Sequence, residues 1–522
     1  MYSKTIYILM NMRYLFLAIA VLLTMSAVAQ ETYENTKFID NDLNGTARYV
    51  GMGGAMDALG SDISTISTNP AGIGLFRRSM ANLSFGLISQ QGVKNFTSGH
   101  KNNASFDQIG FVYALRNGRN SFLNFAFNYH KSRNFDQILS ASGILSNASQ
   151  NKLTTTKARL GIFKSDKDAT YNQLDHLYMN NLVQQTNAAG GKTFGYYPAT
   201  GYTFDQAVKG YIGEYDFNVS GNIQDRIYLG MTVGIHDVHY KHYGEYQEAF
   251  VPNKENIQGV RIADNREITG TGVDLKLGAI FRPIEGSPFR VGLSITTPTW
   301  YDLTTSNSTT IDTGKKSQRI GESYDFKIFT PWRFGVSAGH TVGNWLALGA
   351  SYEYADYGTT DTRINDGGYY DSWYGQYYES SNSDKAMNDH TKRVLKGVSI
   401  LKLGLEYKPL SDFAVRMGYN YVSPMFDRDG FKDGSISSAG TFYASQTAYT
   451  NWQSTNRFTC GFGYMIGKYN FDFAYQFSAT KGDFYPFMSY YDNSNPKENN
   501  IVDAVRVNNK RHQLLFTLGY KF

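Results

Sequence analysis

The first candidate site is a group of three histidines close together in sequence, His236, His239 and His242, which could bind a metal ion or haem. Imidazoles bind metal ions and haem iron. On a strand, however, side chains alternate between two faces, so His236 and His242 share a face while His239 lies opposite. The three cannot converge on one ion. We predict no metal site and no cofactor, and we keep His236 and His242 as candidate ligands only for an alternative function in haem binding.

Four cationic residues form the second candidate site: Arg290, Arg333, Lys402 and Arg416. Each falls on the charged face of a predicted strand. An apolar ligand with a carboxylate, such as a fatty acid, needs a cation at the end of an apolar slot, and these side chains could supply it. The same residues could instead pair with carboxylates on that face, which are Asp274, Glu353, Glu406 and Asp472.

Catalysis is the third possibility. An enzyme acting on lipid esters would need a nucleophile within hydrogen-bond reach of a base. His130 and His512 are possible bases, but no serine lies in a recognisable setting such as Gly-x-Ser-x-Gly. We predict that the protein is not an enzyme, and we keep a lipid-modifying enzyme of the outer membrane as a second alternative.

The elements that position these residues are strands. Apolar and polar residues alternate with period two from residue 79 to the end, as in the run Leu514, Phe516, Leu518, Tyr520, Phe522. We count fourteen such segments, starting near residues 79, 105, 121, 213, 226, 268, 288, 320, 345, 396, 412, 455, 468 and 508. One of them crosses Pro331, where we expect a bulge or a break, because proline cannot donate to a ladder.

The first 29 residues have the pattern of a secretory signal: Lys4 and Arg13, an apolar run from Leu15 to Val28, and small residues up to Ala29. Cleavage there changes the formal charge from +5 to +3 (5 − 2), which does not suggest nucleic acid as a partner. Cys460 is the only cysteine, so no internal disulfide is possible. Mean hydropathy is −0.40, although the chain has 40 Tyr and 34 Phe. An exported chain of this composition fits an outer-membrane β-barrel, in which only alternate residues face lipid.

Short links alternate with long ones along the strands, which is the sidedness of a bacterial outer-membrane barrel. We therefore predict an all-β fold: a transmembrane antiparallel barrel of fourteen strands over residues 79–522, with an N-terminal plug over residues 30–78. The predicted extracellular loops are 134–212, 241–267, 360–395, 424–454 and 481–507. Within the first of them, Asn172 to Gln185 has the spacing of a short amphipathic helix. The loop 360–395 is rich in Tyr and Trp and reads as a surface for glycan, lipid or partner contact.

The plug segment supplies a family resemblance. The residues are Gly45-Thr46-Ala47-Arg48, Gly51-Met52-Gly53-Gly54-Ala55 and above all Asn69-Pro70-Ala71-Gly72, and further matches include Thr330-Pro331-Trp332-Arg333-Phe334-Gly335-Val336 and Leu403-Gly404-Leu405-Glu406-Tyr407-Lys408-Pro409. This pattern resembles the FadL/TodX family of outer-membrane transporters for long-chain fatty acids and other hydrophobic compounds, some relatives of which are labelled hemin receptors. The resemblance covers almost the whole mature chain.

The resemblance implies passive outer-membrane transport of a hydrophobic small molecule, with Asn69, Pro70, Ala71 and Gly72 forming a gate in the hatch. A turn without a gating role is the other reading of these four residues. In the family, a kink in the third strand makes a sideways exit, but Phe122 to Arg133 contains neither Gly nor Pro, so we expect no kink there. As partners we expect the ligand, outer-membrane lipid and the barrel-assembly machinery, the last through the final strand ending at Phe522. We expect a monomer in the bacterial outer membrane.

Overall fold

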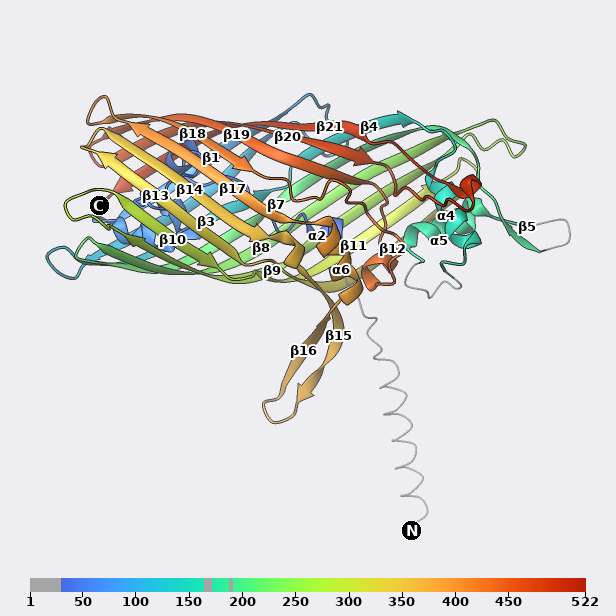
Figure 1. Cartoon of the computed structure of the whole chain (residues 1–522), viewed down its shortest axis with the longest axis horizontal. Helices are drawn as coiled ribbons and strands as arrows, with labels where there is room; N and C mark the ends of the chain where they lie inside the picture. Colours follow the sequence, from blue (N-terminus) through green and yellow to red (C-terminus); the bar gives the residue numbers. More distant parts are fainter. Residues whose placement is uncertain (1–29, 164–170, 187–190) are drawn as a thin grey trace, which may run out of the picture.

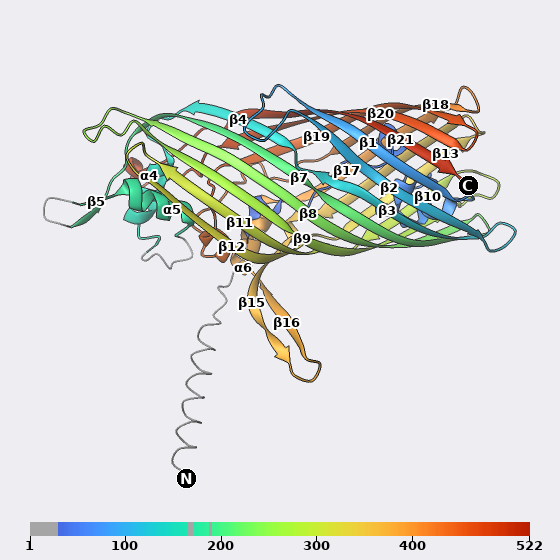
Figure 2. The ribbon, with the colours of Figure 1, turned by 180° about the vertical axis from the view of Figure 1, so that it is seen from behind.

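The computed structural model describes residues 30–163, 171–186 and 191–522. The predicted signal peptide, residues 1–29, lies outside the described residues. The chain forms one antiparallel barrel with its axis horizontal in Figures 1 and 2. None of the helices in the described part of the chain is both long enough and apolar enough to span a membrane.

Fourteen passages of the chain make the barrel wall, as the alternation predicted. The last strand pairs with the first, from Met80 with Lys521 to Gln91 with Lys510, and this ladder closes the wall. In chain order the wall strands are β1 (Met80–Gln91), β2 (Asn102–Arg116), β3 (Phe122–Asn134) with β4 (Gln137–Ile144), β7 (Ala199–Ile223), β8 (Ile227–Phe250), β9 (Gly259–Phe281), β10 (Arg290–Thr296) with β11 (Trp300–Asp312), β12 (Ser317–Phe329) with β13 (Arg333–Val342), β14 (Leu346–Asp356), β17 (Gly397–Tyr407), β18 (Phe413–Val422), β19 (Tyr449–Ile466), β20 (Tyr469–Tyr485) and β21 (Val505–Lys521).

Strands on the long-loop side are longer than predicted. β7, β9 and β19 begin at Ala199, Gly259 and Tyr449 rather than near 213, 268 and 455. The predicted loop 241–267 is mostly strand, since β8 continues to Phe250, and β4 and the start of β7 occupy part of the predicted loop 134–212. Above the bilayer the outer face of a strand meets water, so the apolar alternation that marks a strand is lost there.

The wall is interrupted at two prolines. The passage across Pro331 breaks between Phe329 and Arg333, as expected for a residue that cannot donate to the ladder. A matching break at Pro298 separates β10 from β11 in the neighbouring passage. β10 pairs with β13, and β11 with β12, so both breaks lie at the same level of the barrel.

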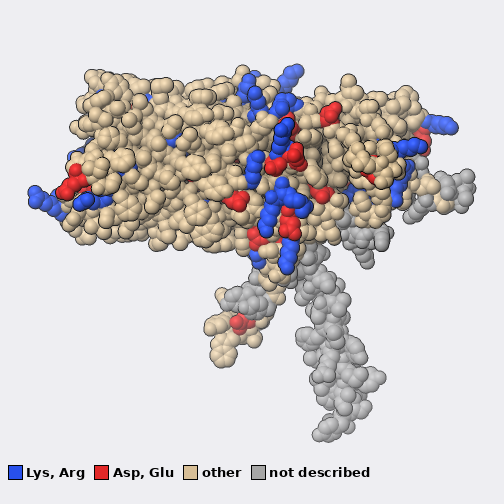
Figure 3. Space-filling model, viewed as in Figure 1, with Lys and Arg blue, Asp and Glu red and all other residues tan. Residues whose placement is uncertain are grey.

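The inner and outer faces of the barrel wall differ as the period-two alternation of the sequence predicted. Charged residues of the strands, such as Asp274, Lys402 and Arg416, are buried in the lumen, whereas Phe85, Leu403 and many other large apolar residues are exposed on the outside. On the face seen in Figure 3, the surface between the left tip and the middle of the barrel is almost free of charge, and a band of Lys, Arg, Asp and Glu runs across the middle. This belt of apolar surface is the part of the barrel suited to lipid.

The N-terminal segment lies inside the barrel. Its short elements are α2 (Thr32–Asn35), α3 (Ala47–Gly51) and two 3-10 turns, η1 (Ile63–Ser67) and η2 (Pro70–Leu75). α3 contacts β18 to β21, and η2 contacts β7, β8 and β9, so the segment touches opposite parts of the wall. Almost every side chain from Ala47 to Phe76 is buried.

A cap covers the long-loop end. It contains α4 (Gln150–Arg159), α5 (Gln173–Tyr178), a π-helical turn η3 (Met179–Val183), and the short strands β5 (Gln184–Thr186) and β6 (Lys192–Phe194). The predicted amphipathic helix is confirmed, because Leu174, Leu177 and Leu182 on α5 and η3 are buried in the apolar core of the cap. The remaining loop elements are η4 (Tyr357–Thr359), α6 (Lys385–Val394), α7 (Ala439–Phe442) and η5 (Pro496–Glu498).

The Tyr-rich loop is a hairpin of β15 (Asp361–Asp371) and β16 (Gln376–Ser383), and it projects sideways from the middle of the barrel (Figures 1 and 2). Its tip exposes Tyr370, Trp373 and Tyr374. The hairpin leaves the wall near the charged band of Figure 3.

Candidate functional site

The plug rests on a row of glycines in the wall. Gly339, Gly349, Gly404 and Gly418 are direct partners across β13, β14, β17 and β18. A Cβ on Gly349, Gly404 or Gly418 would lie closer than 3.0 Å to the plug backbone between Met52 and Ala55. Only glycine leaves room for the plug to lie directly on the wall at these positions.

The motif Asn69-Pro70-Ala71-Gly72 has a glycine seat of its own. The Asn69 side chain is fully buried, and its Oδ1 accepts a hydrogen bond from the Ala71 N–H at 3.2 Å, which caps η2. A Cβ on Gly230 would overlap Pro70, and one on Gly278 would overlap Asn69 Oδ1. The motif is therefore a rigid turn that fits flush against β8 and β9.

Ion pairs hold the plug from the other side. Arg48 of the plug forms a bidentate pair with Glu406, at 2.9 and 3.1 Å. Arg416 bonds the same Glu406 and also Asp472, both at 2.7 Å. Asp57 of the plug lies 3.5 Å from Lys402 Nζ. Paired charges of this kind are tolerated in a crowded lumen because each has an opposite partner.

The four cations predicted as ligand contacts are thus engaged with the plug or the wall. Arg333 bonds the carbonyl of Ile39 at 2.6 Å and lies 3.5 Å from Glu353, and Arg290 bonds the carbonyl of Leu59 at 2.8 Å. Lys402 and Arg416 have the partners just described. None of the four lines the larger lumen cavity found in the described part of the chain.

The larger cavity, of about 240 Å³, lies between the first part of the plug, from Tyr33 to Asn44, and the barrel wall. Part of its wall is apolar or aromatic, and the remaining, larger number of lining residues are polar or charged; the apolar part includes Ile88, Phe135, Leu139, Phe204, Val208, Tyr240, Val422, Met425, Phe426, Tyr449, Trp452 and Phe484. Its cationic side is formed by Arg133, Arg457 and Arg511, none of which the sequence singled out.

Asp42 of the plug stands among these arginines. Its carboxylate oxygens lie 3.6 Å from Arg133, 3.8 Å from Arg457 and 4.0 Å from Arg511. Arg133 also pairs with Asp40 at 2.8 Å. Three guanidinium groups therefore face two carboxylates at this point, while the charged residues that line the whole cavity, which include Glu34, Lys37 and Asp107, sum to zero (4 − 4).

The wall beside this cavity is irregular between β2 and β3, where we expected no kink. The ladder of β2 with β3 ends at the pair Gln108 and His130. The register of β1 with β2 skips Asp107, and that of β3 with β7 skips Ser132, so a bulge lies in each strand at the end of the ladder. The expectation failed because a bulge needs an extra residue rather than a Gly or Pro.

The plug crosses this irregular zone. Asn44 Nδ2 donates to Asp107 Oδ1 of β2 and to the Lys131 carbonyl of β3, each at 3.1 Å. The Asp42 N–H donates to the Ser132 carbonyl at 2.8 Å, and the Asn134 N–H donates to Asp42 Oδ2 at 2.9 Å. Residues 42–44 thus supply bonds at the point where the two strands stop pairing.

His236 and His242 share the inner face, as alternation predicted, and His239 lies on the outside. Both His236 and His242 are buried in the lumen. His236 Nε2 hydrogen-bonds Asp274 at 2.9 Å, and His242 Nε2 bonds Gln446 at 2.9 Å. Six residues of strand place them about 20 Å apart, so they cannot coordinate one haem iron together.

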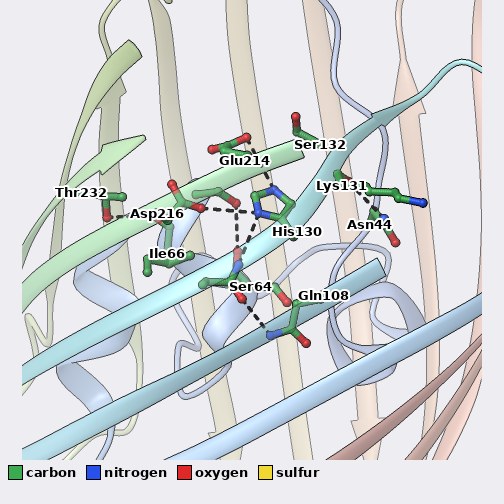
Figure 4. A network of polar contacts seen from close by, with 12 residues as sticks. Asn44, Ser64, Ile66, Gln108, His130, Lys131, Ser132, Glu214, Asp216 and Thr232 are labelled. Carbon is green, nitrogen blue, oxygen red and sulfur yellow. Dashed lines mark hydrogen bonds and ion pairs between the residues drawn. The ribbon is translucent and has the colours of Figure 1, made fainter. Parts of the chain in front are cut away.

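The two histidines considered as catalytic bases have other surroundings. His130 faces Glu214 and Asp216 (Figure 4) and also contacts Asn128, whereas His512 bonds Tyr475 and Gln91 on the outside of the barrel. In the described part of the chain, neither imidazole has a Ser or Thr hydroxyl among these partners.

His130 belongs to a buried cluster with Glu214, Asp216, His236, Asp274 and Lys276, which sequence reasoning missed as a group. The residues come from β3, β7, β8 and β9, and nothing in their spacing along the chain shows that the strands bring them together. Imidazole and carboxylate groups are donors that could hold a metal ion.

Comparison with known proteins supports the fold. No family model matches the chain, and no curated protein matches its sequence. A Pseudomonas aeruginosa FadL homologue of known structure superposes with a TM-score of 0.53 at 11% identity, over 92% of this chain and 99% of that chain. The Ralstonia pickettii toluene transporter TbuX gives 0.47 at 14% identity, and the P. putida toluene transporter TodX gives 0.48 at 11%, each over 92% of this chain and 99% of the other.

At these identities the likeness concerns the fold alone. The fold of the P. aeruginosa FadL homologue is the one inferred from the plug motif and the strand pattern, so the resemblance is confirmed at that level.

Proposed function

We propose that this protein is an outer-membrane transporter that admits hydrophobic small molecules, such as long-chain fatty acids or similar lipids, by passive diffusion. The observation that supports this most directly is the lumen cavity, which is lined both by apolar and aromatic side chains and by the guanidinium groups of Arg133, Arg457 and Arg511. An apolar slot binds the chain of such a ligand, and a guanidinium group binds its carboxylate. No chemical step is required, so the protein is not an enzyme in this account.

The route begins at the cap and reaches the cavity from the long-loop side. Its exit is the zone between β2 and β3, where the ladder ends and plug residues 42–44 fill the wall. To open this zone, only the few hydrogen bonds between the plug and the wall must break. Separating two strands of a regular ladder would break a longer run of hydrogen bonds. A ligand leaving sideways enters the bilayer without crossing the plug.

A cross-link across this zone tests the exit. The pair Asn44→Cys and Asp107→Cys, in a Cys460→Ser background, places thiols where the two side chains now hydrogen-bond. We expect a short bis-methanethiosulfonate cross-linker, which attaches to each thiol through a disulfide, to abolish uptake of a labelled fatty acid, and a reducing agent that cleaves those disulfides to restore it. The control pair Thr32→Cys and Thr391→Cys, whose wild-type hydroxyls lie 2.9 Å apart, joins the plug to α6 away from this zone. Uptake that persists with the first pair fully cross-linked contradicts the sideways exit.

We further propose that Asn69, Pro70, Ala71 and Gly72 form a gate in the plug. The Asn69 side chain fixes the turn, and Ser220 holds the Pro70 carbonyl at 2.8 Å. Losing a capping side chain costs about 0.5–2 kcal/mol, so Asn69→Ala should loosen the turn without unfolding the barrel. Faster fatty-acid uptake at unchanged heat-modifiability on gels is the expected result. Unchanged uptake with normal assembly would leave these residues as a structural turn only.

The same proposal says in which membrane the barrel lies and which partners it contacts. We propose that the apolar belt of Figure 3 sits in the bacterial outer membrane in contact with its lipid. The final strand, ending at Phe522, is the element that the barrel-assembly machinery would recognise, and the protein acts as a monomer. The Trp and Tyr side chains at the tip of the β15–β16 hairpin suit the interface between lipid and water.

A further inference from the structure

Gln30, the residue that follows the predicted signal peptide, has a fitted place inside the barrel. The Tyr324 hydroxyl of β12 donates to its side-chain Oε1 at 3.1 Å, and Asn35 Nδ2 donates to its main-chain carbonyl at 3.4 Å. On another side, a Cβ on Gly440 of α7 would lie 2.8 Å from the carbonyl carbon of Gln30. The start of the plug is therefore held by the wall, by α7 and by the plug itself.

One polar atom of Gln30 does not fit this place. Its side-chain Nε2 is buried and makes no hydrogen bond within the described part of the chain, although a primary amide nitrogen carries two N–H donors. Nearly all buried polar atoms in native proteins have a partner, so an exception calls for an explanation. The site suits a residue that has the side-chain carbonyl oxygen but lacks the amide nitrogen.

The carboxylates of the first stretch of the plug, residues 30–37, are already paired. Glu31 lies 3.0 Å from Lys432 Nζ, and its two oxygens also accept backbone N–H groups of α2. Glu34 lies 2.7 Å from Lys37 and 2.8 Å from Arg266. Neither carboxylate is left over for another cation.

Cleavage after Ala29 would add such a cation. It makes the nitrogen of Gln30 a free α-amine, and an ordinary α-amine, with a pKa of about 7.7–8.0, is mostly protonated at neutral pH. A buried charge without an opposite partner is unfavourable. The surroundings of Gln30 therefore favour an N-terminus that carries no charge.

We propose that the signal peptide is removed after Ala29 and that the new N-terminal Gln30 is converted to a pyroglutamyl residue. The α-amine nitrogen attacks Cδ of the side-chain amide and forms a new C–N bond. The bond between Cδ and Nε2 breaks, and Nε2 leaves as ammonia with the proton lost by the amine. Both reacting groups belong to one residue, so the step is intramolecular and needs no second substrate.

The five-membered lactam removes both mismatches at once. It keeps a carbonyl oxygen that can accept the Tyr324 hydroxyl, and it has neither the unpaired amide nitrogen nor the positive charge. Because Gln30 is enclosed in the folded protein, the ring closes before the plug packs into the barrel. This maturation step does not depend on which ligand the barrel carries.

Amine labelling followed by mass spectrometry tests the proposal. The mature protein is purified from outer membranes and unfolded, and its free amines are dimethylated before digestion, so that an open N-terminus is labelled and cannot cyclise later. Trypsin, which then cuts only at arginine, releases residues 30–48. We expect this peptide to carry no label on its first residue and to be lighter than the encoded sequence by one ammonia molecule, apart from the label on Lys37.

Gln30→Asn is the matched control. It keeps a primary amide but is one methylene shorter, so cyclisation would need a strained four-membered ring, and its α-amine should carry the label. The labelling is done on unfolded protein, so the control is readable even if this variant assembles poorly. A wild-type peptide that begins at Gln30 with a labelled amine, or a mature chain that begins at another residue, overturns the proposal.

Discussion

Adding a single methyl group at Gly404 and at Gly418 should open the barrel. In Gly404→Ala/Gly418→Ala the new Cβ atoms would overlap the Met52 carbonyl and the backbone of Met52 and Gly53. Because both sides of this contact are backbone, no side-chain rotation relieves it, and the plug must lift. Overpacking of this kind costs about 1–3 kcal/mol per site, and each 1.4 kcal/mol changes an equilibrium tenfold.

The measurement is conductance of single channels in planar bilayers. The wild-type barrel should conduct poorly because its lumen is filled by the plug, and the double variant should show a conductance at least about tenfold higher, typical of a water-filled barrel. Gly118→Ala is the matched control, since its Cβ would meet only Ser121 at 3.5 Å in a short turn. A double variant that assembles, conducts like wild type and still protects its plug from protease would show that the glycine row does not seat the plug.

The second large effect concerns the arginines of the cavity. Arg457→Gln and Arg511→Gln should each weaken binding of a long-chain fatty acid by about 10–100-fold, because hydrogen bonds to charged groups contribute about 1.5–3 kcal/mol. Binding of the corresponding methyl ester, which has no charge, should change little. Isothermal titration of the purified protein with both ligands measures the difference.

Replacing Asp42 should have the opposite effect on fatty-acid affinity from replacing the arginines. Asp42→Asn removes the carboxylate that lies 3.6–4.0 Å from the three arginines, so the cavity gains one positive charge relative to the wild type and the fatty acid should bind more tightly. Asparagine keeps an oxygen to accept the Asn134 N–H, which preserves the local structure. If the acid and the ester lose affinity equally in the arginine variants, and Asp42→Asn has no effect on the acid, the cavity does not recognise a carboxylate.

The fold was accessible from sequence because lipid imposes a strict rule on the wall. Every second residue must be apolar within the bilayer, so strands such as β17 and β21 begin within three residues of the predicted positions. The same rule assigned Asp274, Lys402 and Arg416 to the lumen. Above the bilayer the rule no longer applies, which is why the outer part of β7 was not recognised as strand.

The cationic side of the cavity was harder to predict. By alternation from His130, Arg133 should point outwards, and the bulge that skips Ser132 turns it into the lumen instead. Arg457 and Arg511 lie on strands far from β3 in sequence, and only closure of the barrel brings all three near Asp42. The glycines facing the lumen were visible in the sequence, but their role as a seat depends on the path of the plug.

Identification of the ligand bound in the cavity tests the central claim most directly. The protein is purified from outer membranes in mild detergent, and the bound small molecules are extracted and identified by mass spectrometry, with Arg457→Gln prepared in parallel. The account predicts a long-chain fatty acid or a related acidic lipid near one equivalent in the wild type and a much smaller amount in Arg457→Gln. A bound porphyrin, or an open water-filled lumen without bound lipid, would contradict it.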